Sequence, residues 1–228
     1  MTNGFHTPAP DTPQLDWLDG CIPVAKRFDD PYFSLSGGLS ETRYVFLTGN
    51  NLPARFTPGF HIAELGFGTG LNMLAALIAW RIAGIPGRLK FTSFEAFPLS
   101  LPDTARALTA FPEALAMAEP LFDQWPAGRI VMPDLDATII FGDARDTLPA
   151  WQGMADAWFL DGFSPAKNPE LWAPPLMAAV ARQTRAGGTF ATYTAAGHVR
   201  ASLTNAGFSV MRQQGFGTKR HMTSGVLQ

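Results

Sequence analysis

A glycine-rich turn between an apolar strand and an apolar helix constrains the fold of this chain more than any other feature. Residues 60–65 form a short apolar run, and residues 71–83 carry apolar side chains at helical spacing. The turn between them places glycine at every second position, as Gly66, Gly68 and Gly70. Glycine lets the backbone turn sharply and approach a ligand closely, and the start of the following helix offers free N–H groups. The pattern predicts a strand–turn–helix unit with a ligand at the turn.

Strand and helix patterns alternate along the rest of the chain. We expect further strands at 89–94, 137–141, 155–160, 189–194, 208–212 and 222–227, and helices at 103–117 (with a break at Pro112), 170–185 and 195–205. Alternation at this spacing is typical of a mainly parallel sheet with helices on both faces, and the closing pair of strands indicates an antiparallel edge. We therefore predict an α/β, Rossmann-like fold with a mostly parallel seven-stranded sheet and an antiparallel edge hairpin.

The composition suits one folded domain with an added N-terminal segment. Of the 228 residues, 46% are hydrophobic and only 16% are charged, which favours a packed core over disorder. Pro and Asp are frequent in residues 1–30, which show little periodicity and are predicted to form an irregular arm. We expect a short helical or extended piece at 41–47. Residues 1–58 are thus predicted to be an arm and extension packing on the core, and residues 59–228 the Rossmann-like domain.

Several classes of protein are disfavoured by composition. Cys21 is the single cysteine, so a disulfide framework or a Cys-x-x-Cys metal site is excluded, and the four histidines show no metal-ligand spacing. No signal peptide is visible and the longest apolar stretch is too short to span a bilayer, so we expect a cytoplasmic protein without a membrane partner. The net charge of -2 argues against a dedicated nucleic-acid binder, and any RNA contact would need a local basic patch.

The spacing of the turn distinguishes between ligands. It reads Gly-x-Gly-x-Gly and lacks the extra residue of the dinucleotide fingerprint. Glu64, just before the glycines, would repel a pyrophosphate but would suit a cation. S-adenosylmethionine has no phosphate and carries a sulfonium and an ammonium, so we predict it as the ligand; the alternative is a tight turn that binds nothing. The predicted cofactor-binding residues of this segment are Glu64, Gly66, Phe67, Gly68, Thr69, Gly70 and Asn72.

Acidic residues follow three of the later predicted strands. Glu95 is placed to take the two ribose hydroxyls of an adenosyl group, although a solvated strand-end Glu is the alternative. Asp143, followed by Ala144, either accepts a hydrogen bond from an adenine amino group or caps a short helix. Asp161 follows a strongly apolar strand, and ligands of open α/β sheets bind beyond the carboxyl ends of the strands. We therefore expect Asp161 at the site of methyl presentation, with a loop cap as its alternative role.

The chain resembles a known family in six segments. These are YFS at 32–34, GLSETRYVFL at 38–47, GFGTGLN at 66–72, FEAFPL at 94–99, WFLDGFSPAKNP at 158–169 and GFGTKR at 215–220. Together they resemble the methyltransferase domain of the tRNA 5-methylaminomethyl-2-thiouridine biosynthesis family, MnmC, from about residue 31 onward. The loop after Asp161 and the ETRYVF segment are far more specific than the glycine turn, which all such methyltransferases share.

The resemblance implies a class I S-adenosylmethionine-dependent methyltransferase that acts on tRNA. The family methylates the primary amine of 5-aminomethyl(-2-thio)uridine at the anticodon wobble position, giving 5-methylaminomethyl(-2-thio)uridine. In many bacteria this domain is fused to a flavin-dependent oxidase that prepares the amine. No second glycine fingerprint follows the last predicted strand, so we expect a methyltransferase-only form with neither FAD nor metal. A separate enzyme would then supply the aminomethyl uridine.

Methyl transfer to an amine needs a neutral nucleophile and a group that orients it. Asp161 is the candidate catalytic residue, since it can orient the amine and accept its proton directly or through water. Phe163 can stack on a base, and the Tyr32-Phe33 pair can hold it, although Phe33 also suits a packing role. The remaining predicted substrate-binding residues are Lys167, Asn168, Lys219 and Arg220, and the three cations are candidates for contacts with the RNA backbone.

Arg43 has several possible partners: the cofactor carboxylate, an RNA phosphate or a neighbouring acid in a surface ion pair. Lys219 and Arg220 have the alternative of a solvated cluster at a strand end. Two other functions also remain open. One is a methyl- or aminopropyl-transferase acting on a small amine, which the acidic net charge favours. The other is a non-catalytic module that retains the fold and binds RNA or a protein partner.

Overall fold

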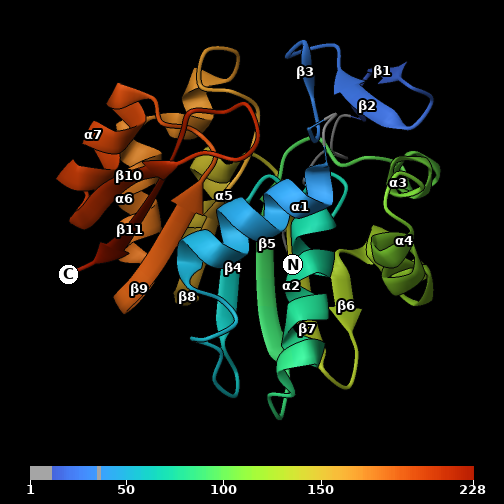
Figure 1. Ribbon diagram of the computed structural model, residues 1–228, viewed down its shortest axis with the longest axis horizontal. Coiled ribbons are helices and arrows are strands. Elements are labelled where there is room, and N and C mark those ends of the chain that lie inside the picture. Colours follow the sequence, from blue (N-terminus) through green and yellow to red (C-terminus); the bar gives the residue numbers. More distant parts are fainter. Residues whose placement is uncertain (1–11, 35–36) are drawn as a thin grey trace, which may run out of the picture.

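The computed structural model describes residues 12–34 and 37–228. Within these residues the central sheet has eight strands, in the order β10-β11-β9-β8-β4-β5-β7-β6 (Figure 1). Their bounds are β4 His61–Leu65, β5 Leu89–Glu95, β6 Arg129–Val131, β7 Leu135–Phe141, β8 Ala155–Leu160, β9 Thr184–Thr192, β10 Phe208–Gln214 and β11 His221–Leu227. Strands β4, β5, β7, β8 and β9 pair in parallel, whereas β10 and β11 form an antiparallel hairpin that β11 joins to β9. The predicted fold class and edge hairpin are confirmed.

The predicted number of strands was wrong by one. The additional strand, β6, pairs antiparallel with the far edge of the sheet at β7. Strand β9 also begins earlier than predicted, because Gly187 and Gly188 lie within it rather than in a turn before it. The pairing with β8 shifts there, from Ala155 with Thr184 to Ala157 with Thr189. The glycines therefore mark a bulge, which they allow because they have no side chain.

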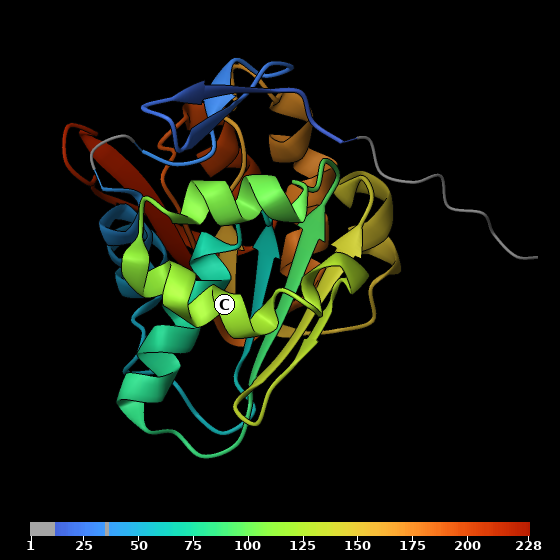
Figure 2. The same cartoon turned by 90° about the vertical axis from the view of Figure 1, so that its right-hand side faces the viewer.

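Helices cover both faces of the sheet (Figures 1 and 2). Their bounds are α1 Gly38–Thr42, α2 Leu71–Ala83, α3 Leu101–Leu108, α4 Pro112–Ala118, α5 Ala144–Ala150, α6 Pro174–Arg182 and α7 Gly197–Asn205. One hydrophobic cluster contains residues of α1, α2 and α4, and the other contains residues of α5, α6 and α7. Neighbouring residues of β8 belong to different clusters, Phe159 to the first and Trp158 to the second. Since side chains alternate along a strand, both faces of the sheet are buried.

Most of the predicted helices are present with shifted ends. The helix at 71–83 has the bounds that were predicted. The helix predicted at 103–117 is divided into α3 and α4 at Pro112, because proline has no N–H to donate and disfavours helical backbone before it. The helix predicted at 170–185 is a 3-10 turn, Pro169–Trp172, followed by α6. Residues 41–47 are helical, since α1 continues into a π-helical turn, Arg43–Leu47.

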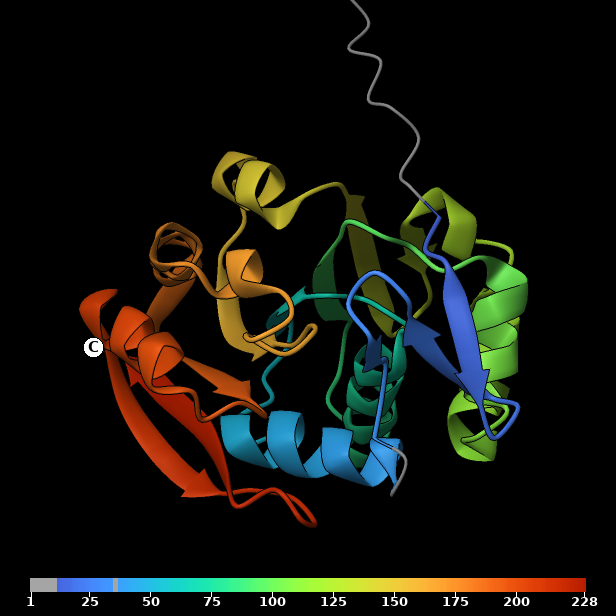
Figure 3. The same ribbon diagram turned by 90° about the horizontal axis from the view of Figure 1, so that it is seen from above.

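The N-terminal segment contains more regular structure than predicted. Strands β1 Leu15–Leu18, β2 Ile22–Ala25 and β3 Asp30–Pro31 pair in an antiparallel sheet, where an irregular arm was expected; residues 1–11 of that arm lie outside the described residues. The β1–β2 turn contains Asp19 and Gly20, both with positive φ. Arg106 of α3 donates to the Gly20 carbonyl at 2.7 Å and lies 3.8 Å from the ring of Trp17. These contacts hold the small sheet beside α3, beyond the carboxyl ends of the parallel strands (Figures 2 and 3).

Two further properties bear on the class of protein. Across residues 12–34 and 37–228, no helix has the length and apolar character needed to cross a membrane. In the same ranges no cluster of three or more His, Cys, Asp or Glu side chains is arranged to hold a metal ion.

Candidate active site

A cleft of about 830 Å³ lies at the carboxyl ends of the parallel strands, under the small N-terminal sheet. It receives side chains from the glycine turn, the ends of β5, β7 and β8, the segment after β3, α1 and the β10–β11 loop. The structure brings most of the predicted site residues together here, namely Tyr32, Phe33, Gly66, Phe67, Gly68, Thr69, Asn72, Glu95, Asp143, Ala144, Asp161, Phe163, Lys167, Asn168 and Lys219. Four predicted residues do not line this cleft: Arg43, Glu64, Gly70 and Arg220.

The glycine turn forms the floor of the cleft. Gly66, Gly68 and Gly70 have φ values of 83°, 52° and 72°, a region that favours glycine. A Cβ on Gly66 would lie 3.2 Å from the Asp161 carbonyl oxygen, so this glycine lets the end of β8 approach the turn. A Cβ on Gly70 would lie 2.5 Å from the ring of Trp125, so the third glycine serves packing. Phe67 and Thr69, the residues between the glycines, also line the cleft.

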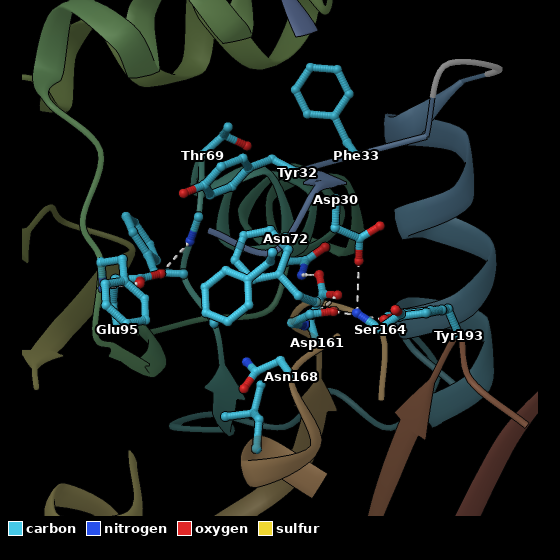
Figure 4. A pocket seen from close by; sticks show the side chains of 18 of the residues that line it. Asp30, Tyr32, Phe33, Thr69, Asn72, Glu95, Asp161, Ser164, Asn168 and Tyr193 are labelled. Atoms are coloured by element: carbon cyan, nitrogen blue, oxygen red, sulfur yellow. Dashed lines mark hydrogen bonds between the residues drawn. The ribbon is translucent and has the colours of Figure 1, made fainter. Parts of the chain in front are cut away.

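Glu95 closes one end of the cleft and fixes the shape of the turn. Its Oε2 accepts a hydrogen bond from the Gly68 backbone N–H at 2.8 Å, and its Oε1 accepts one from Phe97 N–H at 2.7 Å (Figure 4). Burial raises the pKa of Glu95, and the backbone N–H groups oppose that shift. Each carboxylate oxygen keeps a second lone pair, so Glu95 can still accept a hydroxyl donor from a ligand.

Glu64 lies behind the cleft rather than in it. The side chain is fully buried and accepts hydrogen bonds from Ser93 Oγ at 2.6 Å and from Asn72 Nδ2 at 2.8 Å. Burial raises its pKa well above the usual range for Glu. The sequence predicts a direct interaction of Glu64 with a cation, but the structure places its side chain outside the lining of the cleft. Its contact with the cleft is indirect, through Asn72.

Asn72 connects the buried acid to the acid of the cleft. Its Nδ2 also donates to Asp161 Oδ2 at 2.8 Å, while its Oδ1 accepts a hydrogen bond from Thr42 Oγ1 at 3.0 Å. The Asn72 amide therefore uses both of its donor hydrogens and its carbonyl oxygen within the protein. The arrangement fixes the orientation of the Asp161 carboxylate (Figure 4).

Asp161 has the properties of a proton acceptor near neutral pH. Its other oxygen, Oδ1, accepts a hydrogen bond from the Gly162 backbone N–H at 2.8 Å. Burial raises the pKa of Asp161 to about 6, against the opposing hydrogen bonds from Asn72 and Gly162. Lys219 lowers this pKa and Glu41 raises it through their charges. A carboxylate of this basicity is ionised at neutral pH and accepts a proton more readily than an ordinary Asp.

Asp143 fills the helix-cap role that was considered for it. Its Oδ1 accepts the Arg145 backbone N–H at 2.8 Å, so it caps α5. Arg145 also forms an ion pair with it at 2.6 Å, and this side-chain hydrogen bond lowers the pKa of Asp143. The residue borders the cleft beside Ala144.

Aromatic rings form the wall opposite the glycine turn. Phe163 stacks on Phe28 with ring centroids 4.5 Å apart and meets the edge of Tyr32 at 5.2 Å. Tyr32 lies over Gly68, and its buried hydroxyl has no hydrogen-bond partner within the described part of the chain. Burial raises the pKa of this hydroxyl, so it remains a neutral donor. Phe33 borders the cleft and also packs against Phe111 at 4.9 Å, which agrees with the packing role considered for it.

The basic candidates differ in their surroundings. Arg43 pairs with Glu113 at 2.7 Å on the surface, which is the ion-pair alternative considered for it. Lys167 pairs with Asp29 at the mouth of the cleft, where the Asp29 side chain is 92% exposed. Lys219 points to Glu41 of α1 at 2.7 Å, and its ammonium lies 4.6 Å from the centre of the Tyr193 ring. Arg220 is exposed and lies outside the cleft.

Sequence reasoning missed several residues of the site. Phe28, Asp30, Glu41 and Tyr193 all line the cleft but were not singled out. Asp30 accepts a hydrogen bond from Ser164 N–H at 2.8 Å, which ties β3 to the loop after β8. Glu41 belongs to a segment that carried the family resemblance, which is the one signal that pointed to it. Phe28 and Asp30 come from a segment without periodicity, whereas Tyr193 lies in the strand predicted at 189–194, and only the fold brings all three to the cleft.

The fold and the cleft define the class of protein. A glycine turn, a carboxylate after the second parallel strand and a buried Asp after the fourth share one cleft at the carboxyl edge of the sheet. Residues 112–228 match the family described as S-adenosyl-L-methionine-dependent methyltransferase, and the chain belongs to this family. It is therefore a methyltransferase, and its cofactor is S-adenosyl-L-methionine.

Individual proteins similar to this chain indicate a more specific group within the methyltransferases. The chain is 47% identical over 235 residues to the tRNA 5-methylaminomethyl-2-thiouridine biosynthesis bifunctional protein MnmC of Vibrio cholerae serotype O1, over 94% of this chain and 35% of that protein. It is 45% identical to the protein of the same name from Aeromonas hydrophila, over 93% and 35%. The crystal structure of MnmC2 from Aquifex aeolicus superposes with a TM-score of 0.77 and 28% identity, over 97% of this chain and 72% of that one. The resemblance predicted from sequence is confirmed, and the chain spans about a third of the length of the bifunctional relatives.

Proposed function

We propose that this chain methylates the primary amine of 5-aminomethyl(-2-thio)uridine at the wobble position of tRNA. The observation that carries the proposal is the 47% identity to a tRNA 5-methylaminomethyl-2-thiouridine biosynthesis protein across 94% of the chain. The site supports it, because a buried Asp with a pKa of about 6 and a wall of aromatic rings share one cleft. The first suits an amine that must lose a proton, and the second suits a nucleobase.

The end of the cleft nearest Glu95 suits the adenosyl part of the cofactor. Glu95 keeps lone pairs for ribose hydroxyls, Asp143 and Ala144 border the same end, and Gly66 and Gly68 leave room along the floor. The partnerless hydroxyl of Tyr32 is a buried donor that a bound polar group would satisfy. The residues present thus fit the cofactor. When bound, S-adenosyl-L-methionine supplies an electrophilic methyl group carried on a sulfonium.

Asp161 orients the acceptor and takes up its proton. The side chain is fixed by Asn72 and Gly162 N–H, each of which occupies one carboxylate oxygen. The second lone pair of either oxygen is available to an amine hydrogen. The amine lone pair would form the new N–C bond as the S–C bond of the sulfonium breaks and a neutral thioether leaves. The proton that the methylated nitrogen sheds then passes to Asp161, directly or through water. Positioning of this kind can supply roughly 7–11 kcal/mol in favourable cases.

The remaining predicted residues have roles in holding tRNA. Phe163 and Tyr32 are positioned to hold the flipped base, and Asn168 borders the same wall. Lys167 and Arg220 are the cations best placed for the RNA backbone. Lys167 lies at the mouth of the cleft, and Arg220 is exposed and follows Lys219 in the sequence. These contacts would make tRNA affinity fall steeply with added salt.

Two consequences follow for the cell. The aminomethyl group of the substrate has to be made by another reaction first, one that leaves a free primary amine on the uridine. Because its substrate is a tRNA, the chain is expected to act in the cytoplasm, with no part in a membrane.

The test combines labelled S-adenosyl-L-methionine with tRNA that carries 5-aminomethyl uridine, followed by nucleoside analysis. The proposal predicts that label and the mass of one methyl group appear in that nucleoside. Matched controls are tRNA without the aminomethyl group and a polyamine such as spermidine, both expected to stay unlabelled. Methylation of the polyamine with none of the tRNA would instead identify a small-amine methyltransferase.

A further inference from the structure

The Asp161 end of the cleft gathers charged groups from separate elements. Glu41 comes from α1, Asp30 from β3, Asp161 from the end of β8, and Lys219 from the loop between β10 and β11. Tyr193, which follows β9, lies among them: its hydroxyl donates to the Gly162 carbonyl at 2.8 Å, and its pKa is raised by burial and by Asp161, Asp30 and Glu41. Figure 4 shows Tyr193 and Glu95 on opposite sides of the pocket, with Asp161 between them.

The ammonium of Lys219 is held by two groups that line the cleft. Its Nζ is 2.7 Å from Oε1 of Glu41, whose side chain is only 10% exposed. The same Nζ lies over the face of the Tyr193 ring at 4.6 Å, where a cation is attracted by the ring electrons. The Lys219 side chain is 45% exposed, but its ammonium is held by two partners, and the carboxylate partner is buried, whereas the Asp29 partner of Lys167 is 92% exposed.

The charges at this end create a difficulty for the reaction. Asp30, Glu41 and Asp161 favour the protonated form of any amine that enters, because negative charge stabilises an ammonium. A protonated amine has no lone pair and cannot be methylated. A positive charge next to the same site opposes this effect and favours the neutral amine. Lys219 lines the same cleft as Asp161, and its charge lowers the pKa of that carboxyl.

We propose that Lys219 is a positioning residue for methyl transfer, in which Glu41 and the Tyr193 ring fix its ammonium so that the acceptor amine beside Asp161 is neutral. The proton leaves the ammonium nitrogen of the acceptor for Asp161 or for solvent, and the lone pair left behind is the nucleophile. This assignment rests on the proposed function, since it requires an amine acceptor. It gives Lys219 and Glu41 opposite electrostatic effects on one site.

Because Lys219 and Glu41 have opposite charges, removing either charge should shift the Asp161 pKa in opposite directions, which can be tested. Lys219→Met removes the positive charge and Glu41→Gln removes the negative charge, while Arg212→Met removes an exposed positive charge of β10 outside the cleft. The first readout is the titration of the Asp161 carboxyl carbon by NMR in the ligand-free protein, assigned with Asp161→Asn. The other charged or titratable groups facing Asp161 are Glu64, Tyr193 and Asp30, and all three variants leave them unchanged.

The second readout is the pH dependence of the single-turnover rate, with enzyme and cofactor saturating. We expect Lys219→Met to move the Asp161 titration and the acid limb of the rate to higher pH, by roughly half a unit to one unit for a nearby charge in a partly wet site. Glu41→Gln moves both to lower pH, and Arg212→Met moves neither. A defect in folding would not produce shifts of opposite sign.

The outcomes separate the two proposals. If Lys219→Met leaves both curves in place, or only weakens tRNA binding in a salt-dependent way, the assignment of Lys219 is overturned while tRNA methylation stands. If the wild-type protein methylates no tRNA, the proposed function fails, and the NMR titration still decides whether Lys219 and Glu41 set the basicity of Asp161. Should Lys219→Met fail to fold, Lys219→Gln, which removes the same charge but keeps a polar side chain, replaces it with the same expected upward shift.

Discussion

The chemistry of the site depends on a short chain of hydrogen bonds in which Asn72 is central. The amide donates to Glu64 and to Asp161, and its carbonyl oxygen accepts from Thr42. Buried carboxyl groups that lose a donor carry the full cost of desolvation. The network therefore stabilises the fold and keeps the Asp161 carboxylate in one orientation.

Removing the Asn72 amide should change both stability and pH dependence. In Asn72→Ala, the loss of a hydrogen bond that lowers the Asp161 pKa should move the acid limb of the single-turnover rate to higher pH. Glu64 and Asp161 each lose a donor, so the free energy of unfolding should fall by about 1–3 kcal/mol in urea titrations. Thr42→Val, which removes only the bond to the Asn72 carbonyl oxygen, should have a smaller effect. An acid limb unchanged in Asn72→Ala would contradict this role.

At the residue scale, the sequence predicted which residues lie at the site better than it predicted their contacts and burial. Asp161, Glu95 and Asp143 were identified because each follows a strand, and the carboxyl ends of parallel strands meet at one edge. Glu64 was identified on charge, but burial beneath Asn72 and Ser93 changes its character, and burial depends on packing that a local motif does not contain. Glu41 and Tyr193 reach the site only through long-range contacts.

At the scale of elements, the glycine turn has two roles that the sequence did not separate, namely lining the cleft and packing against the core. Gly66 and Gly68 line the cleft, whereas Gly70 packs against Trp125 at the start of α2. A Cβ at position 70 meets the Trp125 ring at 2.5 Å, and the backbone there has positive φ.

The packing role predicts a large loss of stability in Gly70→Ala. Crowding a well-packed site typically costs about 1–3 kcal/mol, and the left-handed backbone adds roughly 1 kcal/mol for an alanine. Gly84→Ala is the matched control, because Gly84 also has positive φ but a Cβ there meets nothing within 4 Å. Urea unfolding of both variants should show the greater loss for Gly70→Ala. Equal losses of unfolding free energy in the two variants would mean that backbone strain alone, without crowding against Trp125, explains the effect of Gly70→Ala.

Long, periodic elements were predictable, and short ones were not. The helix at 71–83 was predicted with its bounds because its apolar residues recur at helical spacing. Strand β6 has three residues, too few to show a period, and forms because β7 offers it an edge. Strands β1 and β2 were missed although Asp19-Gly20 is a turn signal for a hairpin, since the surrounding prolines and acids masked the alternation.

For the whole molecule, the Asp161 carboxylate in the cleft should lower the free energy of unfolding, and this effect should be visible in the pH dependence of unfolding. Burial raises the pKa of Asp161 in the folded state to about 6, from an ordinary value of 3.8. Between these values the folded state binds more protons than the unfolded state, so the contribution of Asp161 to stability falls as the pH rises through this window. The acid is thus held in place for function at some cost to the fold.

Asp161→Asn should therefore be more stable relative to wild type at pH 7.5 than at pH 4. We expect the difference in unfolding free energy between the two proteins to grow by about 1–2 kcal/mol across this range, less than full linkage because the side chain borders an open cleft. Asp143→Asn is the control without a pH effect in this range: Arg145 lowers the pKa of Asp143 from 3.8, so its contribution to stability is lost only as the pH falls below that value. Asn retains the helix cap. A difference for Asp161→Asn that does not vary with pH would contradict the raised pKa.

The most direct measurement of the central claim compares wild type with Asp161→Asn in a single-turnover assay. Label is followed from S-adenosyl-L-methionine to the amine of 5-aminomethyl uridine in tRNA, and cofactor affinity is measured in parallel by calorimetry. Because Asp161 acts on the amine and not on the adenosyl group, the rate should fall by about 10²–10⁴-fold while cofactor affinity changes little. An unchanged rate, or a rate lost only in proportion to cofactor affinity, would contradict the account.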